Sequence, residues 1–500
     1  MAKSEVKYGA LISYLSIILN SLYGLVITPF ILGAIGKSEY GVYQSVAAIT
    51  ASVAILEFGI GSTIQRYLAR YLALKDERNN SNFSAMALVQ TAVLSLVMAI
   101  TCFCIYFALD SMYGRTFTEL EMMRAKQVFI VLSVYVVLHI YENYLWGIIS
   151  GYNRFIFSNS TKVILLFLKV GLYLLILPFL QNALAIVIIS LTIEIIQIIV
   201  EYLYIKLKLH HRVKLYKWDN SVFKESFFYT LLLFIQSLIV QFNGNVDNMF
   251  IGAMIGATSV TVYSFAIVLF GMYENFAVSI SSVILPSVTN YIVAGADARQ
   301  MEKVVIKYGR VQWITLGAAL FGFIIYGKEF YYLWLGEGFE DCYALALILM
   351  IPVMFPLIVN TCLAILKAQN LLTFRTIALT YAAVVNVLIT YIGMHYYGYW
   401  AAAIGTATST IISGVISLNI YYHVKLKLRM IYIYRQIFKR SLLCMLITAV
   451  VCYPLNYIMY GNWIALIIKI AAFLVIFGLF MIFYGFNQEE KQMFKIKIQI

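Results

Sequence analysis

The 500-residue chain is poor in charge, proline and cysteine: charged residues make up 12% of it, and it has 6 Pro and 6 Cys. A soluble domain carries about 25% charged residues, so this composition excludes a soluble globular protein. The cysteines have no metal-ligand or disulfide spacing. The sequence also has no Walker-type phosphate loop, no zinc pattern and no serine or cysteine nucleophile arrangement. We therefore expect neither an enzyme nor a metal or cofactor site.

Hydrophobic residues make up 62% of the chain and form roughly fourteen stretches, each near the ~20 residues that one helix needs to cross a bilayer. The sequence therefore predicts an all-α integral membrane protein with about fourteen transmembrane helices. The expected helices begin near Gly9, Val42, Phe83, Gln127, Ser158, Ala183, Phe227, Val260, Ile306, Cys342, Thr373, Trp400, Ser441 and Trp463.

Basic residues alternate between rich and nearly empty connections. Of the 36 Lys and Arg residues, 29 fall at the termini and in the even-numbered loops. Because basic loops stay in the cytoplasm, both termini should be cytoplasmic. The net charge of +13 then lies beside anionic lipid heads rather than on nucleic acid. His210 and His211, in the basic loop after the sixth helix, are predicted to be solvated.

A weak internal repeat relates the two halves of the chain. A shift of 220 positions superimposes Gly36 on Gly256 and Tyr43 on Tyr263, at the junction of the first two helices of each half. Six helices separate the matching points, so the halves should be parallel repeats that enclose a cavity with alternating access. The expected parts are a six-helix lobe at 1–206, a basic cytoplasmic linker at 207–226, a second lobe at 227–424, and two extra helices with a cytoplasmic tail at 425–500.

Asp247 is the strongest candidate for binding or coupling, because a charge deep in a bilayer costs several kcal/mol and needs a function or a partner. At 100° per residue, Gln236, Asn243 and Asp247 share one helix face, which we expect to line the cavity. The alternative is a structural acceptor that stabilises a break at Gly244.

Glu57 and Glu274 occupy matching helices of the two lobes and could carry protons, although ordinary hydrogen bonding between helices is an equal alternative. Weaker acidic candidates are Glu142, Glu194 and Glu201, the first of which follows His139.

Two lysines lie within apolar segments. Lys169 and Lys469 could contact a phosphate, and pairing with one of the weaker glutamates is the alternative. Arg66 and Arg310, at inner helix ends, could reach a phosphate from the cytoplasmic side, and Asn20 adds a polar group to the first helix. Prolines within helices permit bends, so Pro29 and Pro286 are the candidate hinges.

Several segments resemble bacterial polysaccharide-unit flippases of the Wzx type, in the superfamily of multidrug and oligosaccharidyl-lipid exporters. The segments lie in the first two helices of each half. They are Gly9–Ser16, Gly36–Tyr43, Leu56–Gly61, Arg66–Tyr71 and Asn245–Gly256, with Tyr263 and Pro286.

The resemblance implies twelve core helices in two lobes, two extra helices and a substrate made of a short oligosaccharide on a polyprenyl diphosphate. It implies transport across the bacterial cytoplasmic (inner) membrane for O-antigen, capsule or lipopolysaccharide synthesis without ATP hydrolysis. A proton or sodium gradient would drive it, and polymerase and chain-length proteins would be partners. The alternatives are a cation-coupled multidrug antiporter of the same fold and, more remotely, a glycan polymerase or ligase.

Overall fold

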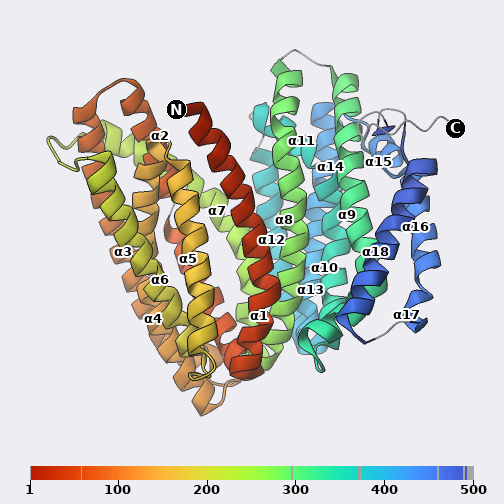
Figure 1. The fold of residues 1–500 in the computed structure, drawn as a ribbon. Helices are drawn as coiled ribbons and strands as arrows, with labels where there is room; N and C mark the ends of the chain where they lie inside the picture. The colour runs from red at the N-terminus through yellow and green to blue at the C-terminus, as the bar shows by residue number, and fades with distance from the viewer. Residues whose placement is uncertain are drawn as a thin grey trace. The chain divides into compact units, whose positions relative to one another are not determined.

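The computed structural model describes residues 2–57, 59–293, 297–369, 371, 373–458, 461–487 and 490–491. It describes their side chains except those of residues 2–11, 13, 14, 17, 18, 21, 229, 231–245, 279–293 and 368. Throughout these ranges the regular structure is helical, which confirms the predicted fold class (Figure 1). Contacts divide the chain into two compact units, Met1–Thr261 and Val262–Ile500.

The first unit contains the helices up to the start of α8. They are α1 (Ala2–Ala54), the 3₁₀ turn η1 (Ile55–Glu57), α2 (Ile60–Ala73), α3 (Glu77–Tyr113), α4 (Glu119–Gly151), α5 (Phe155–Ile176), α6 (Ala183–Tyr204), the π-helical turn η2 (Ile205–Leu209) and α7 (Asn220–Met254). Within this unit α7 packs against α1, α2 and α3. The division at a 207–226 linker stays a prediction.

The second unit begins within α8 (Ala257–Val293). It continues with α9 (Ala298–Leu335), α10 (Glu340–Ile358), α11 (Asn360–Ala368), α12 (Thr373–Tyr397), α13 (Trp400–Thr410), the π-helical turn η3 (Ile411–Ser417), α14 (Leu418–Leu426), α15 (Met430–Phe438), α16 (Ser441–Cys452), α17 (Leu455–Ile458), α18 (Trp463–Phe480) and the π-helical turn η4 (Met481–Gly485).

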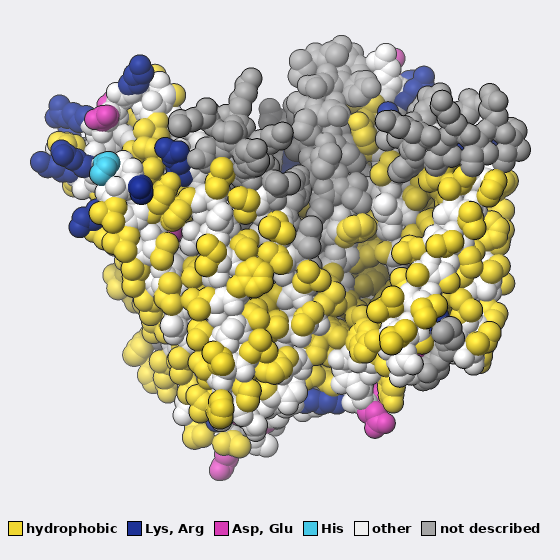
Figure 2. Space-filling model, viewed as in Figure 1, with side chains coloured by type: hydrophobic (Ala, Val, Ile, Leu, Met, Phe, Trp, Pro, Cys, Tyr) yellow, Lys and Arg dark blue, Asp and Glu magenta, His cyan; other side chains and the backbone are white. Residues whose placement is uncertain are grey.

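Every predicted transmembrane stretch begins inside one of these helices. Within the described residues, 12 helices are long and apolar enough to cross a membrane. One of them, Leu22–Ala73, combines the end of α1 with η1 and α2, because α1 runs through the junction between the first two predicted helices. Hydrophobic side chains cover the visible flank of the first unit, and Lys and Arg side chains gather at one end of it (Figure 2). The protein is a multi-pass membrane protein.

Both repeat glycines have a backbone conformation that favours glycine. Gly36 has φ 81° and Gly256 has φ 127°. A side chain is strained at these angles, whereas glycine adopts them at little cost. Gly36 is therefore the kink within α1, and Gly256 separates α7 from α8. This common geometry explains why the repeat signal is strongest at the two junctions.

The segment after η2 is bound to the beginning of α3. The side-chain oxygen of Asn82 accepts hydrogen bonds from the backbone N–H groups of Tyr216 (2.8 Å) and Lys217 (3.0 Å). His211 contacts the Tyr152 hydroxyl through Nδ1 (3.0 Å) and the Ser84 hydroxyl through Nε2 (2.9 Å). The prediction of a solvated His211 is therefore wrong, because residues far away in sequence cover the ring.

Candidate functional site

A group of ionisable and amide side chains lies inside the first unit, where α4, α5 and α6 pack together beside η1. We call it the His139 cluster. Its members are Glu57, His139, Glu142, Asn143, Lys162, Glu194, Gln197 and Glu201.

Glu57 reaches the cluster because the helical path is interrupted after α1. The chain forms the short turn η1, and Gly59 then adopts φ 64° and ψ 31°, a left-handed conformation that glycine tolerates, before α2 begins. The side-chain amide of Asn143 in α4 donates to Glu57 Oε2 at 2.6 Å. The helix break thus holds a carboxylate against α4.

His139 lies between three carboxylates. Its Nδ1 is 2.8 Å from Glu194 Oε1 and 4.0 Å from Glu142 Oε2, and its Nε2 is 4.0 Å from Glu57 Oε1. The ring stacks on Tyr135, with centroids 5.6 Å apart and an angle of 12° between the planes. This arrangement allows the imidazole to exchange a proton with carboxylates on either side.

Gln197 connects the remaining glutamates. Its side-chain amide donates to Glu142 Oε1 at 2.5 Å and to Glu201 Oε1 at 3.2 Å. The Lys162 ammonium lies 3.9 Å from Glu142 Oε1. Residues 194, 197 and 201 lie on one face of α6 because helical neighbours are three or four positions apart.

The cluster has a buried side and a more open side. Glu142, Glu194 and Glu201 are 2%, 5% and 0% exposed, whereas the side chains of His139 and Lys162 are 33% and 43% exposed. The four carboxylates have two cationic partners within 4.0 Å among the described residues, His139 and Lys162. Buried charges are costly without compensation. The arrangement therefore favours uptake of a proton or another cation from the open side.

Of the predicted acidic candidates, Glu57 and the weaker candidates Glu142, Glu194 and Glu201 belong to the cluster. Asp247, on α7 of the same unit, is 2% exposed, and α7 packs against η1. Its predicted face partners Gln236 and Asn243 lie outside the described side chains. Glu274 is half-buried on α8 of the second unit, beside Tyr273, whose hydroxyl donates to the Leu316 carbonyl at 3.3 Å.

Lys469 and Arg310 form buried ion pairs in the second unit. Lys469 is fully buried on α18 and pairs with Glu329 of α9. Pairing was the predicted alternative for this lysine, but its expected partner is wrong: Glu142, Glu194 and Glu201 all lie in the first unit.

Arg310 of α9 pairs in a bidentate manner with Glu490, at 2.6 and 3.0 Å. It also donates to the backbone carbonyls of Gln436, Lys439 and Gly485. These contacts connect α9 to the segment before α16 and to the segment after α18.

The remaining predicted positions differ in their relation to the cluster. Lys169 interacts electrostatically with Glu194 of the cluster, in line with the predicted pairing, and its ammonium lies 5.7 Å from the centre of the Tyr173 ring. Arg66 is exposed on α2. Asn20 is exposed and donates to the Ser16 carbonyl at 2.8 Å. Pro29 lies within α1, and the non-helical backbone is at Gly36 instead. The Pro286 side chain lies outside the described residues.

Sequence reasoning missed His139 and Gln197 and gave the α4 and α6 glutamates too little weight. The available signal was spacing, since His139 and Glu142 are three residues apart on α4, while Glu194, Gln197 and Glu201 repeat along α6. Polar groups that recur at helical spacing on two apolar helices indicate facing stripes. Which helices face each other is set by packing.

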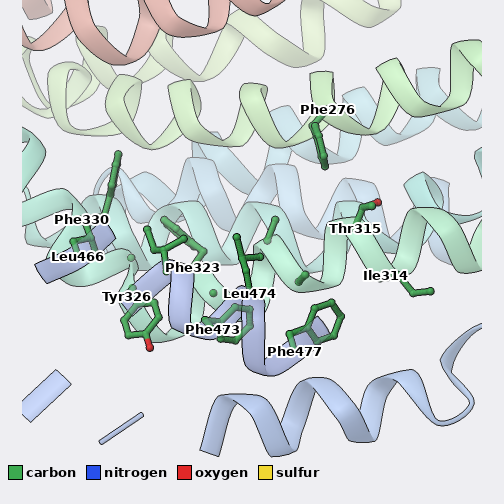
Figure 3. Close-up of a pocket in the computed structure, with 15 residues that line it drawn as sticks. Phe276, Ile314, Thr315, Phe323, Tyr326, Phe330, Leu466, Phe473, Leu474 and Phe477 are labelled. Carbon is green, nitrogen blue, oxygen red and sulfur yellow. The ribbon is translucent and has the colours of Figure 1, made fainter. Parts of the chain in front are cut away.

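An apolar groove of about 530 Å³ lies in the second unit (Figure 3). Its walls come mainly from α9 and α18, with Phe276 from α8, and Phe323, Phe330, Phe473 and Phe477 supply aromatic surface. Among the 15 lining residues, only Thr315 and Tyr326 carry a polar side-chain atom. Such a lining fits a hydrocarbon chain.

Residues 6–292 match the family model described as polysaccharide biosynthesis protein, which is more than half of the chain. The chain belongs to this family. Among curated proteins, no sequence matches the chain.

The fold of this polysaccharide biosynthesis family member is similar to that of the lipid II flippase MurJ in an inward closed conformation. The TM-score is 0.68 at 16% identity, with 95% of this chain and 98% of that chain covered. An inward-facing multidrug resistance transporter of the MATE family and MOP superfamily gives a TM-score of 0.61 at 15% identity, covering 83% and 98%. A MOP superfamily transporter from Pyrococcus furiosus gives 0.57 at 14% identity, covering 85% and 96%. The chain thus shares its fold with a lipid II flippase and with multidrug transporters.

Proposed function

We propose that this protein is a flippase that moves polyprenyl-diphosphate-linked oligosaccharide units from the inner to the outer leaflet of the bacterial cytoplasmic membrane. Alternating access would serve O-antigen, capsule or related polysaccharide synthesis, with both termini cytoplasmic. The observation that carries the proposal is the polysaccharide family match combined with a fold similar to a lipid II flippase over 95% of the chain. The proposal includes no catalytic step and no bound cofactor.

The groove between α9 and α18 supports a lipid-linked substrate. Its apolar lining suits the prenyl tail, which would stay in the hydrocarbon layer while the sugar crosses. Lys469 and Arg310 already bind Glu329 and Glu490. We therefore assign contacts with the diphosphate to other basic groups, namely Arg66 and Lys169.

The His139 cluster supports coupling to an ion gradient. Glu57 was one of the candidates for carrying protons, and it lies beside His139 in a cluster with three further carboxylates. Protonation from the open side would change the charge between α4, α5 and α6. Asp247 and Glu274 remain proposed coupling residues outside this cluster.

Depletion of the protein in its native bacterium tests the function. We expect lipid-linked oligosaccharide to accumulate on the cytoplasmic face while surface polysaccharide falls, and we expect an intact gene copy to reverse both changes. Unchanged surface glycan would contradict the proposal.

A multidrug antiporter is the second candidate, because MATE transporters share the fold at TM-scores up to 0.61. Proton-driven ethidium efflux from proteoliposomes, combined with normal surface glycan in depleted cells, would favour this function. Partners such as polymerase or chain-length proteins are a further proposal, which co-purification with the flippase would test.

A further inference from the structure

The His139 cluster brings together ligands that a divalent metal prefers. One ligand atom each from His139, Glu142 and Glu194 lie within 4.8 Å of one another. Zn²⁺ binds His nitrogen and Glu oxygen at about 2.1 Å, so two ligands of one ion are at most about 4.2 Å apart. Side-chain movements of less than about 1 Å would bring the three groups around one ion.

One carboxylate oxygen next to these ligands provides independent support. Glu201 is fully buried, and its Oε2 atom has no hydrogen-bond partner. Glu201 lies beside Glu142, since both side chains accept from the Gln197 amide. A buried acceptor without a donor is costly. This oxygen therefore indicates a cationic ligand.

Charge and orientation agree with this conclusion. A divalent ion on neutral His139 brings the four carboxylates closer to neutrality than a proton on His139 does. Metal-bound histidines commonly direct their second nitrogen at a carboxylate, and Glu57 occupies that place for Nε2 when Nδ1 binds the ion. Gln197 would hold Glu142 in position through its amide hydrogen bond.

We propose that the His139 cluster binds one divalent transition-metal cation of the Zn²⁺ or Mn²⁺ type through His139, Glu142 and Glu194. The ion enters from the side where His139 and Lys162 are exposed. Binding does not depend on the proposed function. An inhibition of export by the metal would rest on the proposed function, because the metal and the coupling proton would compete for the same side chains.

The test uses the full-length protein in nanodiscs, stripped with a chelator and titrated with Zn²⁺ or Mn²⁺ by calorimetry. We expect one ion per chain, and we expect the affinity to fall at least tenfold in both His139→Gln and Glu194→Gln. X-ray absorption should report one nitrogen donor among oxygens. His395→Gln is the matched control, because His395 is exposed on α12.

Three results would overturn the proposal: no binding to the wild-type protein, equal binding by the cluster variants, or an equal loss in His395→Gln. A response to Na⁺ alone would also overturn it. Thermal unfolding without metal confirms that the variants are folded. Since binding is measured without substrate, a failed titration leaves the flippase proposal standing, and a failed export assay leaves the metal site standing.

Discussion

Buried charges in the two units differ in their partners. In the first unit, the carboxylates of the His139 cluster outnumber their cationic neighbours, and the cluster has an exposed side. In the second unit, buried Lys469 pairs with Glu329 and buried Arg310 with Glu490. Matched pairs hold helices in place, whereas unmatched carboxylates attract a mobile cation. The comparison separates charges that are matched within the protein from those that we propose act in coupling, which composition alone could not do.

The largest effect should come from breaking a matched pair. Lys469→Met leaves Glu329 buried without its ammonium, and loss of one partner of a buried pair costs about 3–5 kcal/mol. We expect a reduction of that size in the free energy of unfolding, measured in detergent. The double variant Lys469→Met/Glu329→Leu should recover most of it. If the double variant were as unstable as Lys469→Met, the loss would not come from an unpaired Glu329 carboxylate, and the explanation would be wrong.

A removed carboxylate in the first unit should instead change transport. Glu57→Gln and Glu194→Gln reduce the excess negative charge, so we expect unfolding free energies within about 1 kcal/mol of wild type. Export of surface polysaccharide should fall roughly tenfold or more. Asp110→Asn, which removes an exposed carboxylate paired with Lys126, is the control and should leave export unchanged. If these two variants were strongly destabilised but exported polysaccharide normally, the cluster carboxylates would be structural, and the contrast between the units would fail.

Filling the groove should have an intermediate effect. A Cβ atom on Gly322 would lie 3.7 Å from Phe473, so Gly322→Leu projects into the groove without a backbone clash. We expect export to fall several-fold while the thermal unfolding midpoint stays near that of wild type. Gly478→Leu on α18 is the matched control, because nothing lies within 4 Å of its Cβ position and residue 478 does not line the groove. Equal export by both variants would argue against a bound prenyl chain.

The smallest expected effect is a pH dependence of stability that arises from His211, in the segment after η2 and outside the membrane-spanning helices. Burial lowers the pKa of His211 from 6.5 to about 4, so the neutral ring is the form that fits beside Tyr152 and Ser84. The neutral His211 ring contributes fully to the free energy of unfolding above pH 6.5, and this contribution is lost as the pH falls toward 4. We expect a loss on the order of 1 kcal/mol because the ring is partly screened by solvent. His211→Gln should flatten this part of the stability curve, and an unchanged curve would contradict the assignment.

Hydrophobic length was sufficient to predict where the helices lie, since each predicted start lies in a helix. The orientation inferred from the basic loops stays a prediction. Gly36 and Gly256 were found because a positive φ requires glycine at both junctions. Charge partners were not predictable: Lys469 and Glu329 are 140 residues apart, and Arg310 and Glu490 are 180 apart. The interruption at Glu57 was also missed, because it contains no proline and only Gly59 marks it. Which charged residues pair with each other depends on which helices pack together, and the pattern of a single sequence does not show that packing.

Translocation of a fluorescent lipid-linked oligosaccharide in proteoliposomes under an imposed proton gradient tests the central claim most directly. The account predicts gradient-dependent movement by the wild-type protein, with the gradient dependence lost in Glu57→Gln and Glu194→Gln and retained in Asp110→Asn. Movement that ignores the gradient in wild type, or that persists with full gradient dependence in both cluster variants, would contradict it.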